Sequence, residues 1–121
     1  MFKIKIRPSD KLYSRYLRIL RHYTCERCGR KYQEGDGLWG LHVSHFHGRS
    51  KESVRFDEEN TDLLCFGDHQ YFTSNPNDYV EWKKERLGEK RFKLLTLRAH
   101  TLGKRDDKLQ VLILKKLLET L

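Results

Sequence analysis

The order of hydrophobic and polar residues along the chain predicts a small domain that mixes helices and strands. FKIKIR (2–7) alternates apolar and basic residues, which is typical of a short strand. LWGLHVSHF (38–46) and TDLLC (61–65) predict two further strands, separated by a polar loop. Helices are expected where apolar residues recur every three or four positions: 11–23, 75–88, 89–103 and 106–121, with a short helix from Phe66. The pattern therefore predicts an α+β fold in a single domain covering residues 1–121.

Helix-terminating residues support two of these predictions. Asn75 and Pro76 stand where a helix cap and its first residue are expected, and Gly88 follows the last residue of the same pattern. The next pattern ends in the same way at Gly103. Tyr79 and Trp82 lie three positions apart in the first of these helices, a spacing that predicts packing residues.

Composition limits the core and indicates the partner. Of 121 residues, 37% are hydrophobic and 35% are charged, so the core is small, and small cores are often supplemented by a metal ion or by oligomerisation. The net charge of +8 favours a polyanionic partner, above all nucleic acid, although a generic basic protein has a similar balance. No apolar run approaches the roughly 20 residues of a membrane span. The first ten residues do not resemble a secretory signal, and an odd number of cysteines suits a reducing compartment such as the cytoplasm.

The cysteines have the spacing of metal ligands. Cys25 and Cys28 are separated by two residues and followed by a glycine, so one tight turn can direct both sulfurs to a single zinc ion. Cys65 and Asp68 repeat the spacing, with aspartate in the fourth place, and a carboxylate is an acceptable zinc ligand. Three histidines compete with Asp68 for the fourth position: His22, His47 and His69.

In combination, these motifs resemble those of a known family. The stretches C-E-R-C (25–28), H-V-S-H-F (42–46), N-T-D-L-L-C (60–65) and F-G-D-H (66–69) occur in the order found in HNH endonucleases, also called the ββα-metal or His-Me finger group. Residues 46–60 and 75–88 are similar to phage recombination nucleases of the NinG/Rap kind. The resemblance implies a zinc-stabilised ββα-metal core at 24–74, preceded by a strand and helix (1–23) and followed by a helical extension (75–121).

The resemblance also implies roles for individual residues. His45 would be the general base that activates water, Asn60 would orient the base or its loop, and His69 would hold a catalytic Mg²⁺ or Mn²⁺ ion. Ser44 stands where many members have a metal-binding acid or histidine, so either His42 or Asn60 is expected to supply the missing ligand. Strand periodicity places His42 and Ser44 on one face and His45 on the other.

Basic residues predict how DNA is held. Arg49 and Arg55 lie in the loop between the base and Asn60, and arginine suits phosphate because its fork donates two parallel hydrogen bonds. The helices over 75–103 are also basic, which suits contact with a DNA backbone or, equally, with solvent.

The final helix has apolar residues over more than one stripe, so it is expected to be covered by its own domain or by a second subunit. A homodimer would suit a nuclease that cuts branched DNA. The sequence therefore predicts a metal-dependent HNH endonuclease acting on DNA, with two rivals: a non-catalytic zinc-stabilised nucleic-acid-binding module, and an assembly factor whose charge is incidental.

Overall fold

A computed structural model describes residues 5–34 and 40–121, and within them the chain is mixed α and β. Two antiparallel strands, β1 (Leu41–His45) and β2 (Thr61–Cys65), form a central sheet. The helices are α1 (Pro8–Leu20), α2 (Phe66–Ser74), α3 (Pro76–Leu87), α4 (Glu89–Ala99) and α5 (Asp107–Glu119), with a 3₁₀ turn, η2 (Glu52–Val54), between the strands. The predicted α+β class is confirmed at this level.

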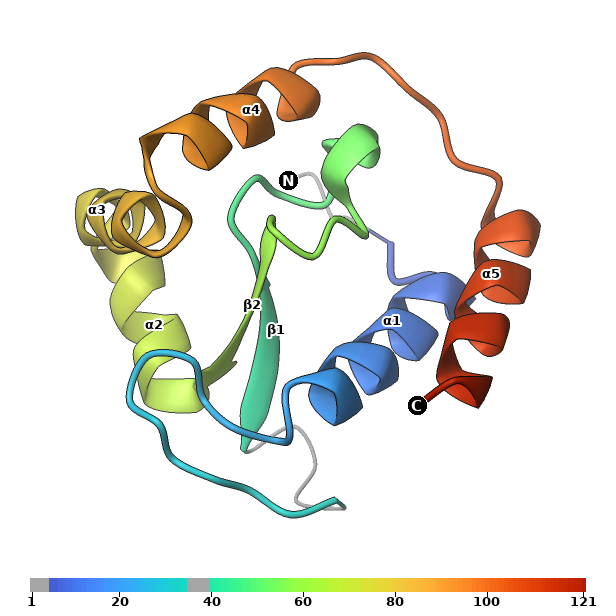
Figure 1. The fold of residues 1–121 in the computed structure, drawn as a ribbon, viewed down its shortest axis with the longest axis horizontal. Coiled ribbons are helices and arrows are strands. Elements are labelled where there is room, and N and C mark those ends of the chain that lie inside the picture. Colours follow the sequence, from blue (N-terminus) through green and yellow to red (C-terminus); the bar gives the residue numbers. More distant parts are fainter. Residues whose placement is uncertain (1–4, 35–39) are drawn as a thin grey trace.

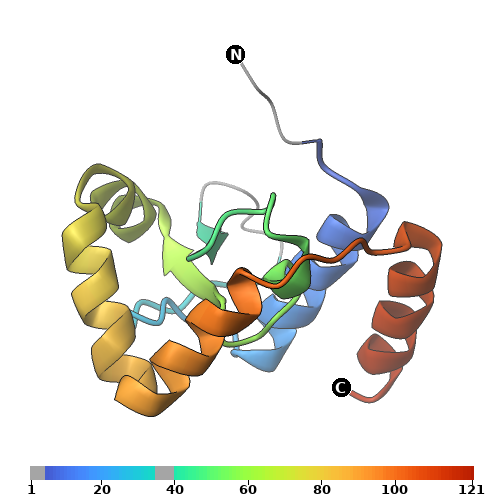
Figure 2. The same cartoon turned by 90° about the horizontal axis from the view of Figure 1, so that it is seen from above.

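The sheet is enclosed by helices on both sides. Figure 1 shows α2 and α3 on one side of the sheet, α1 on the other, and α5 outside α1; Figure 2 shows the same order from above. Leu63 and Leu64 of β2 are fully buried in a core cluster that includes Phe72 of α2 and Tyr79 of α3. Leu41 pairs with Cys65 and His45 pairs with Thr61, so this register fixes the face on which each histidine lies.

Most helix boundaries follow the sequence signals, but α1 begins at Pro8 and ends at Leu20, three residues before each end of the predicted 11–23. α3 begins at Pro76 and ends before Gly88, whose φ of 78° is a left-handed conformation that favours glycine, as predicted. α4 ends at Ala99 instead of Gly103. The strand predicted at 2–7 is wrong for residues 5–7, because α1 already begins at Pro8 and Asp10 accepts a hydrogen bond from the Arg7 backbone. Residues 2–4 and 38–39 of the predicted strands lie outside the described residues.

A buried polar network joins α3 to the sheet. Lys83 donates a hydrogen bond of 2.8 Å to Asp62, and the Tyr79 hydroxyl donates one of 2.6 Å to the same carboxylate. Ser44 lies 2.9 Å from the Tyr79 hydroxyl and donates to its oxygen. All four side chains are buried, so Lys83 is a structural residue and is not available to nucleic acid.

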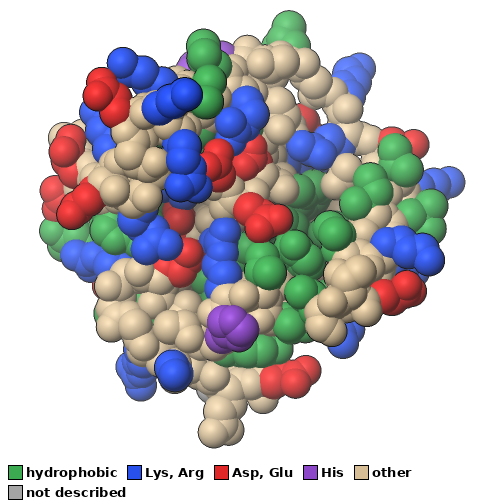
Figure 3. Space-filling view, in the orientation of Figure 1, with side chains coloured by type: hydrophobic (Ala, Val, Ile, Leu, Met, Phe, Trp, Pro, Cys, Tyr) green, Lys and Arg blue, Asp and Glu red, His purple; other side chains and the backbone are tan. Residues whose placement is uncertain are grey.

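The final helix is covered by its own domain on one side. Leu114 of α5 is buried against Tyr13, Tyr16 and Leu17 of α1. Figure 3 shows hydrophobic side chains gathered over α1 and α5. The exposed ones on α5 are Leu109, Leu112, Ile113 and Leu117, and Leu121 follows the helix. The structure contains a single chain, so the homodimer stays a prediction. Among the described residues, no helix combines the length and the apolar character needed to cross a bilayer.

Candidate functional site

Three cysteines and one aspartate converge at the end of the sheet. The ligand atoms of Cys25, Cys28, Cys65 and Asp68 all lie within 4.8 Å of one another. The sulfurs of Cys28 and Cys65 are 3.9 Å apart, and Asp68 Oδ2 lies 3.2 Å from Cys25 Sγ. A tetrahedral zinc ion with Zn–S bonds of about 2.3 Å would separate two sulfurs by about 3.8 Å. The cluster therefore has the dimensions and donor chemistry of a zinc site.

Local backbone structure explains how the four ligands meet. Gly29, with φ of 78°, donates its backbone N–H to the carbonyl of Cys25 at 2.9 Å and closes the turn that brings Cys25 and Cys28 together. On the other side, Cys65 is the N-cap of α2, and its sulfur accepts the backbone N–H of Asp68. The end of β2 and the first turn of α2 therefore present the remaining two ligands.

Electrostatics also favours a cation at this position. Burial raises the pKa of the Cys25 thiol and raises that of Cys65 to about 12. Burial opposes ionisation of Asp68 as well, but hydrogen bonds from Cys25 and Arg27 outweigh it and lower the pKa of this carboxyl. Metal binding requires deprotonated thiols, so an ion would supply the positive charge that the cluster lacks. Among the described histidines, none joins this cluster, so Asp68 is the best candidate for the fourth ligand.

His42 of β1 and His69 of α2 form a close pair. His42 Nδ1 lies 2.9 Å from His69 Nδ1 of α2, with the two rings almost perpendicular. Two nitrogens bound cis to one octahedral ion at about 2.1 Å would be about 3.0 Å apart. Burial lowers the pKa of His69, and the nearby His42 and Arg49 lower it further. The pair therefore has the spacing of two metal ligands, and equally that of a hydrogen bond between imidazoles.

The histidine pair lies at the junction of two cavities. The larger, about 480 Å³, is lined by Ser14, Arg18, His42, Val43, Arg49, Phe66 and His69. The adjoining one, about 350 Å³, is lined by His42, Phe66, His69, Gln70, Thr73 and Ser74. Both volumes are in the range of small-ligand sites, and neither lining contains a carboxylate. We call the two cavities together the histidine groove, which is cationic at the end formed by α1.

His45 is held in one tautomer by the loop that follows β1. Its Nε2 lies 3.0 Å from the backbone carbonyl of Arg55, and a carbonyl can only accept, so Nε2 carries the proton and Nδ1 is left as the basic atom. Burial, assisted by the charge of Arg49, lowers the pKa of His45 to about 4. His45 does not line the histidine groove, but Arg49 lowers the pKa of both His45 and His69 and therefore lies near both.

The lowered pKa of His45 predicts a loss of stability in acid. Between pH 6.5 and 4 the unfolded imidazole binds a proton that the folded one rejects, so stability decreases as the pH falls through this window. We expect His45 to account for about 2 kcal/mol of the stability lost between pH 7 and pH 5. Urea unfolding at both pH values measures this loss. The loss should shrink in His45→Gln and stay unchanged in the control His100→Gln, which alters an exposed histidine; equal losses in wild type and His45→Gln would contradict the assignment.

Asn60 organises the loop that orients His45. Its side chain is fully buried, accepts the backbone N–H of His47 at 2.8 Å, and donates to the carbonyls of His47 and Val54. Val54 directly precedes Arg55, whose carbonyl holds His45. Asn60 therefore joins the loop to the start of β2 through three hydrogen bonds. Its oxygen already accepts a backbone N–H, so it is a poor candidate for a metal ligand.

The two loop arginines have different environments. Arg55 is 1% exposed and donates two hydrogen bonds to Asp10 of α1, at 2.9 and 2.6 Å. The expectation that Arg55 contacts nucleic acid does not fit this placement, because the guanidinium is enclosed by protein. Arg49 lines the histidine groove; among the described residues its buried Nε forms no hydrogen bond, and it lies 3.8 Å from Asp10 Oδ1, a carboxylate that Arg55 already binds. Arg49 is therefore the loop arginine that is positioned to take an anion.

Ser44 stands where many HNH endonucleases have a metal-binding acid or histidine. Its hydroxyl is buried against Tyr79 and does not line the histidine groove. An aspartate at this position would place a second carboxylate beside Asp62 instead of beside the histidine pair. Ser44→Asp is therefore not expected to add a ligand to the histidine pair.

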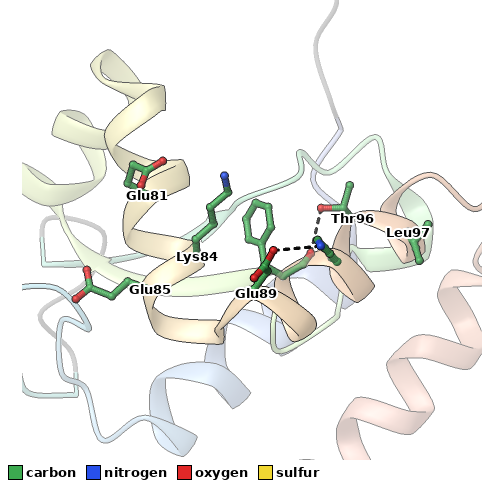
Figure 4. Close-up of a pocket in the computed structure, with 8 residues that line it drawn as sticks. Glu81, Lys84, Glu85, Glu89, Thr96 and Leu97 are labelled. Atoms are coloured by element: carbon green, nitrogen blue, oxygen red, sulfur yellow. Dashed lines mark hydrogen bonds and ion pairs between the residues drawn. The ribbon is translucent and has the colours of Figure 1, made fainter.

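Another hollow of the described surface lies away from the histidine pair. It measures about 940 Å³ and lies between α3 and α4. Figure 4 shows its labelled residues: Glu81, Lys84, Glu85, Glu89, Thr96 and Leu97. Three carboxylates would repel a phosphate backbone here.

The basic side chains of α3 and α4 are largely neutralised by ion pairs. Glutamates pair with Arg86, Arg91 and Lys93, which belong to the helices predicted to contact DNA.

Comparison with known proteins adds no family to this picture: no family model, no curated protein and no solved structure matches the chain.

Proposed function

We propose that the protein is a metal-dependent endonuclease of the HNH kind that hydrolyses phosphodiester bonds in DNA. The observation that carries the proposal is the histidine groove: a pair of imidazoles at metal-ligand spacing lies beside Arg49, whose Nε forms no hydrogen bond, in a lining without a carboxylate. The net charge of +8 agrees with a polyanionic substrate.

The order of elements supports a ββα-metal arrangement. β1 ends at His45, β2 follows the loop held by Asn60, and α2 carries His69 in its first two turns. The zinc cluster joins the beginning of α2 to the loop before β1, so a structural zinc ion would fix the helix that carries His69 against the sheet. The histidine pair and the zinc cluster then have separate tasks.

In the proposed mechanism, His45 is the general base, His42 and His69 are metal ligands, and Arg49 binds phosphate. His45 accepts a proton from water at Nδ1, because Nε2 is engaged by the Arg55 carbonyl. His42 and His69 would hold Mg²⁺ or Mn²⁺, and such an ion stabilises the charge on the scissile phosphate and on the leaving 3′ oxygen. Arg49 holds a phosphate oxygen. The family resemblance implies products with 5′-phosphate and 3′-hydroxyl ends.

The same resemblance suggests the setting. Branched or recombination DNA in a phage-infected or mobile-element host cell is the expected substrate, and a homodimer would supply two sites for one junction. A cytoplasmic location agrees with three free thiols available to hold zinc.

A second candidate is a zinc-stabilised module that binds nucleic acid without cutting it. The observation that favours it is the missing carboxylate: Mg²⁺ prefers oxygen ligands, and the groove offers two imidazoles. Cleavage and binding separate the two functions, because the module would bind DNA with strong salt dependence and leave it intact.

The test is cleavage of supercoiled plasmid and of a four-way junction with Mg²⁺, Mn²⁺ or EDTA. Imidazole ligands favour Mn²⁺ over Mg²⁺, so we expect faster cleavage with Mn²⁺ and none with EDTA. His42→Ala should lower the rate at least tenfold and be partly rescued by excess Mn²⁺. The control His100→Ala changes a histidine outside the groove and should cleave like wild type. An unchanged metal dependence in His42→Ala would remove His42 from the ligand set, and no cleavage under any condition would favour the binding module.

A further inference from the structure

A second arginine, from a distant part of the chain, enters the histidine groove. Arg18 lies near the end of α1 and lines the cavity together with Arg49, His42 and His69. Its guanidinium donates to the carbonyl of Leu41 at 2.7 Å through Nη2 and to the Ser14 hydroxyl through Nη1. The first of these bonds holds the end of α1 against the beginning of β1, one residue before His42.

Arg18 differs from most partly buried arginines of the described chain. Arg55, for example, is neutralised by Asp10, whereas no described carboxylate forms an ion pair with Arg18. Burial lowers the pKa of Arg18, which is the direction expected for a cation without an acidic partner. The two bonds to Leu41 and Ser14 use two of the five N–H donors of a guanidinium. A charged group is thus held in the groove with donors left for a ligand.

We infer that Arg18 and Arg49 form a phosphate-binding site for the nucleic-acid strand that crosses the histidine pair. That the ligand is a nucleic-acid strand rests on the proposed function. That the ligand is an anion does not. Two guanidinium groups in the lining of a cavity that lacks carboxylates favour an anion, and their forks suit the tetrahedral oxygens of a phosphodiester. The bound phosphate is a neighbour of the one at the histidine pair, so Arg18 is a positioning residue.

The site also assigns a direction to the groove. The cationic end lies against α1, and the neutral end is formed by Gln70, Thr73 and Ser74 of α2. A strand anchored at Arg18 and Arg49 would cross His42 and His69 and leave along α2. A role for α1 in holding substrate is not visible in the sequence, because Arg18 precedes His42 by 24 positions and has the spacing of an ordinary helix-surface residue.

The experiment compares binding of a fluorescent 20-base-pair duplex in EDTA, where cleavage does not interfere, by wild type, Arg18→Gln and Arg15→Gln. Glutamine keeps a donor for the Leu41 carbonyl and removes the charge. Arg15 is exposed on the same helix and does not line the groove, so it is the matched control for net charge. We expect Arg18→Gln to weaken binding about tenfold and to lower the slope of log K against log salt by about 1. Arg15→Gln should leave the slope unchanged.

A slope that is the same in Arg18→Gln, Arg15→Gln and wild type would overturn the site. If Arg18→Gln does not fold, as judged by circular dichroism, wild-type protein decides the question. Phenylglyoxal labelling followed by mass spectrometry should then show that the duplex protects Arg18 and Arg49 but not Arg15. Equal labelling of Arg18 with and without DNA would overturn the proposal.

The outcome is separable from that of the nuclease assay. Loss of slope in a protein that never cleaves DNA would support the phosphate site and reject the endonuclease. Normal cleavage by the wild type, together with an unaltered slope in Arg18→Gln, would support the endonuclease and reject the phosphate site.

Discussion

His45→Ala is expected to reduce the rate constant for DNA cleavage by about 10²–10⁴-fold, the usual contribution of a positioned general base. The reason is that Nδ1 of His45 is the basic atom left free by the bond between Nε2 and the Arg55 carbonyl. Because a base acts mainly in the transition state, binding of uncut DNA should change less than threefold. Single-turnover cleavage with Mn²⁺ and binding in EDTA measure the two effects separately.

The matched variant is His45→Gln, which retains a donor for the Arg55 carbonyl and therefore keeps the loop in place. It should be as inactive as His45→Ala, because an amide cannot accept the proton. If His45→Gln cleaves DNA at the wild-type rate, His45 is not the base and the HNH assignment fails. If only His45→Ala is inactive, the residue acts by holding the loop.

The short-range signals of the sequence predicted the elements well. Pro76 and Gly88 fix the ends of α3 through their own backbone geometry, and the pair Cys25 and Cys28 forms a turn within four residues. The meeting of these two cysteines with Cys65 and Asp68 followed from repeated spacing and was predicted as well, since metal ligands share a recognisable pattern.

The sequence could not indicate which charged side chains form ion pairs within the protein. Arg49 and Arg55 look equivalent in the loop, yet Arg55 is buried and donates two hydrogen bonds to Asp10 of α1, whereas Arg49 lies 3.8 Å from the same carboxylate and lines the groove. The sequence likewise gives no sign that Tyr79 of α3 lies against Ser44 and engages its hydroxyl. Such pairings depend on the packing of α1 and α3 against the sheet, and no local pattern encodes them. Arg18 was missed for the same reason.

Removal of zinc is expected to have the largest effect on the fold. The four ligands connect the loop before β1 to the start of α2, and the described hydrophobic core around Leu63, Leu64 and Phe72 is small. Structural zinc sites contribute on the order of 10 kcal/mol of folding free energy, so most of the stability would depend on the ion. Protein purified without added metal should contain about one zinc per chain, as elemental analysis can determine. A chelator should then abolish the cooperative thermal transition.

Asp68→Asn identifies the fourth ligand. Asparagine keeps the size of the side chain but is a weak zinc ligand, so zinc should be lost to a chromophoric chelator at least tenfold faster than from wild type. The control is Asp106→Asn, in which asparagine caps α5 as well as aspartate does, so that only an acidic charge is removed. Cys25→Ser should lose zinc altogether, because Cys25 is the buried member of the cluster. Unchanged zinc retention in Asp68→Asn would transfer the fourth position to a histidine or to water, and fully folded wild-type protein without zinc would reject the site.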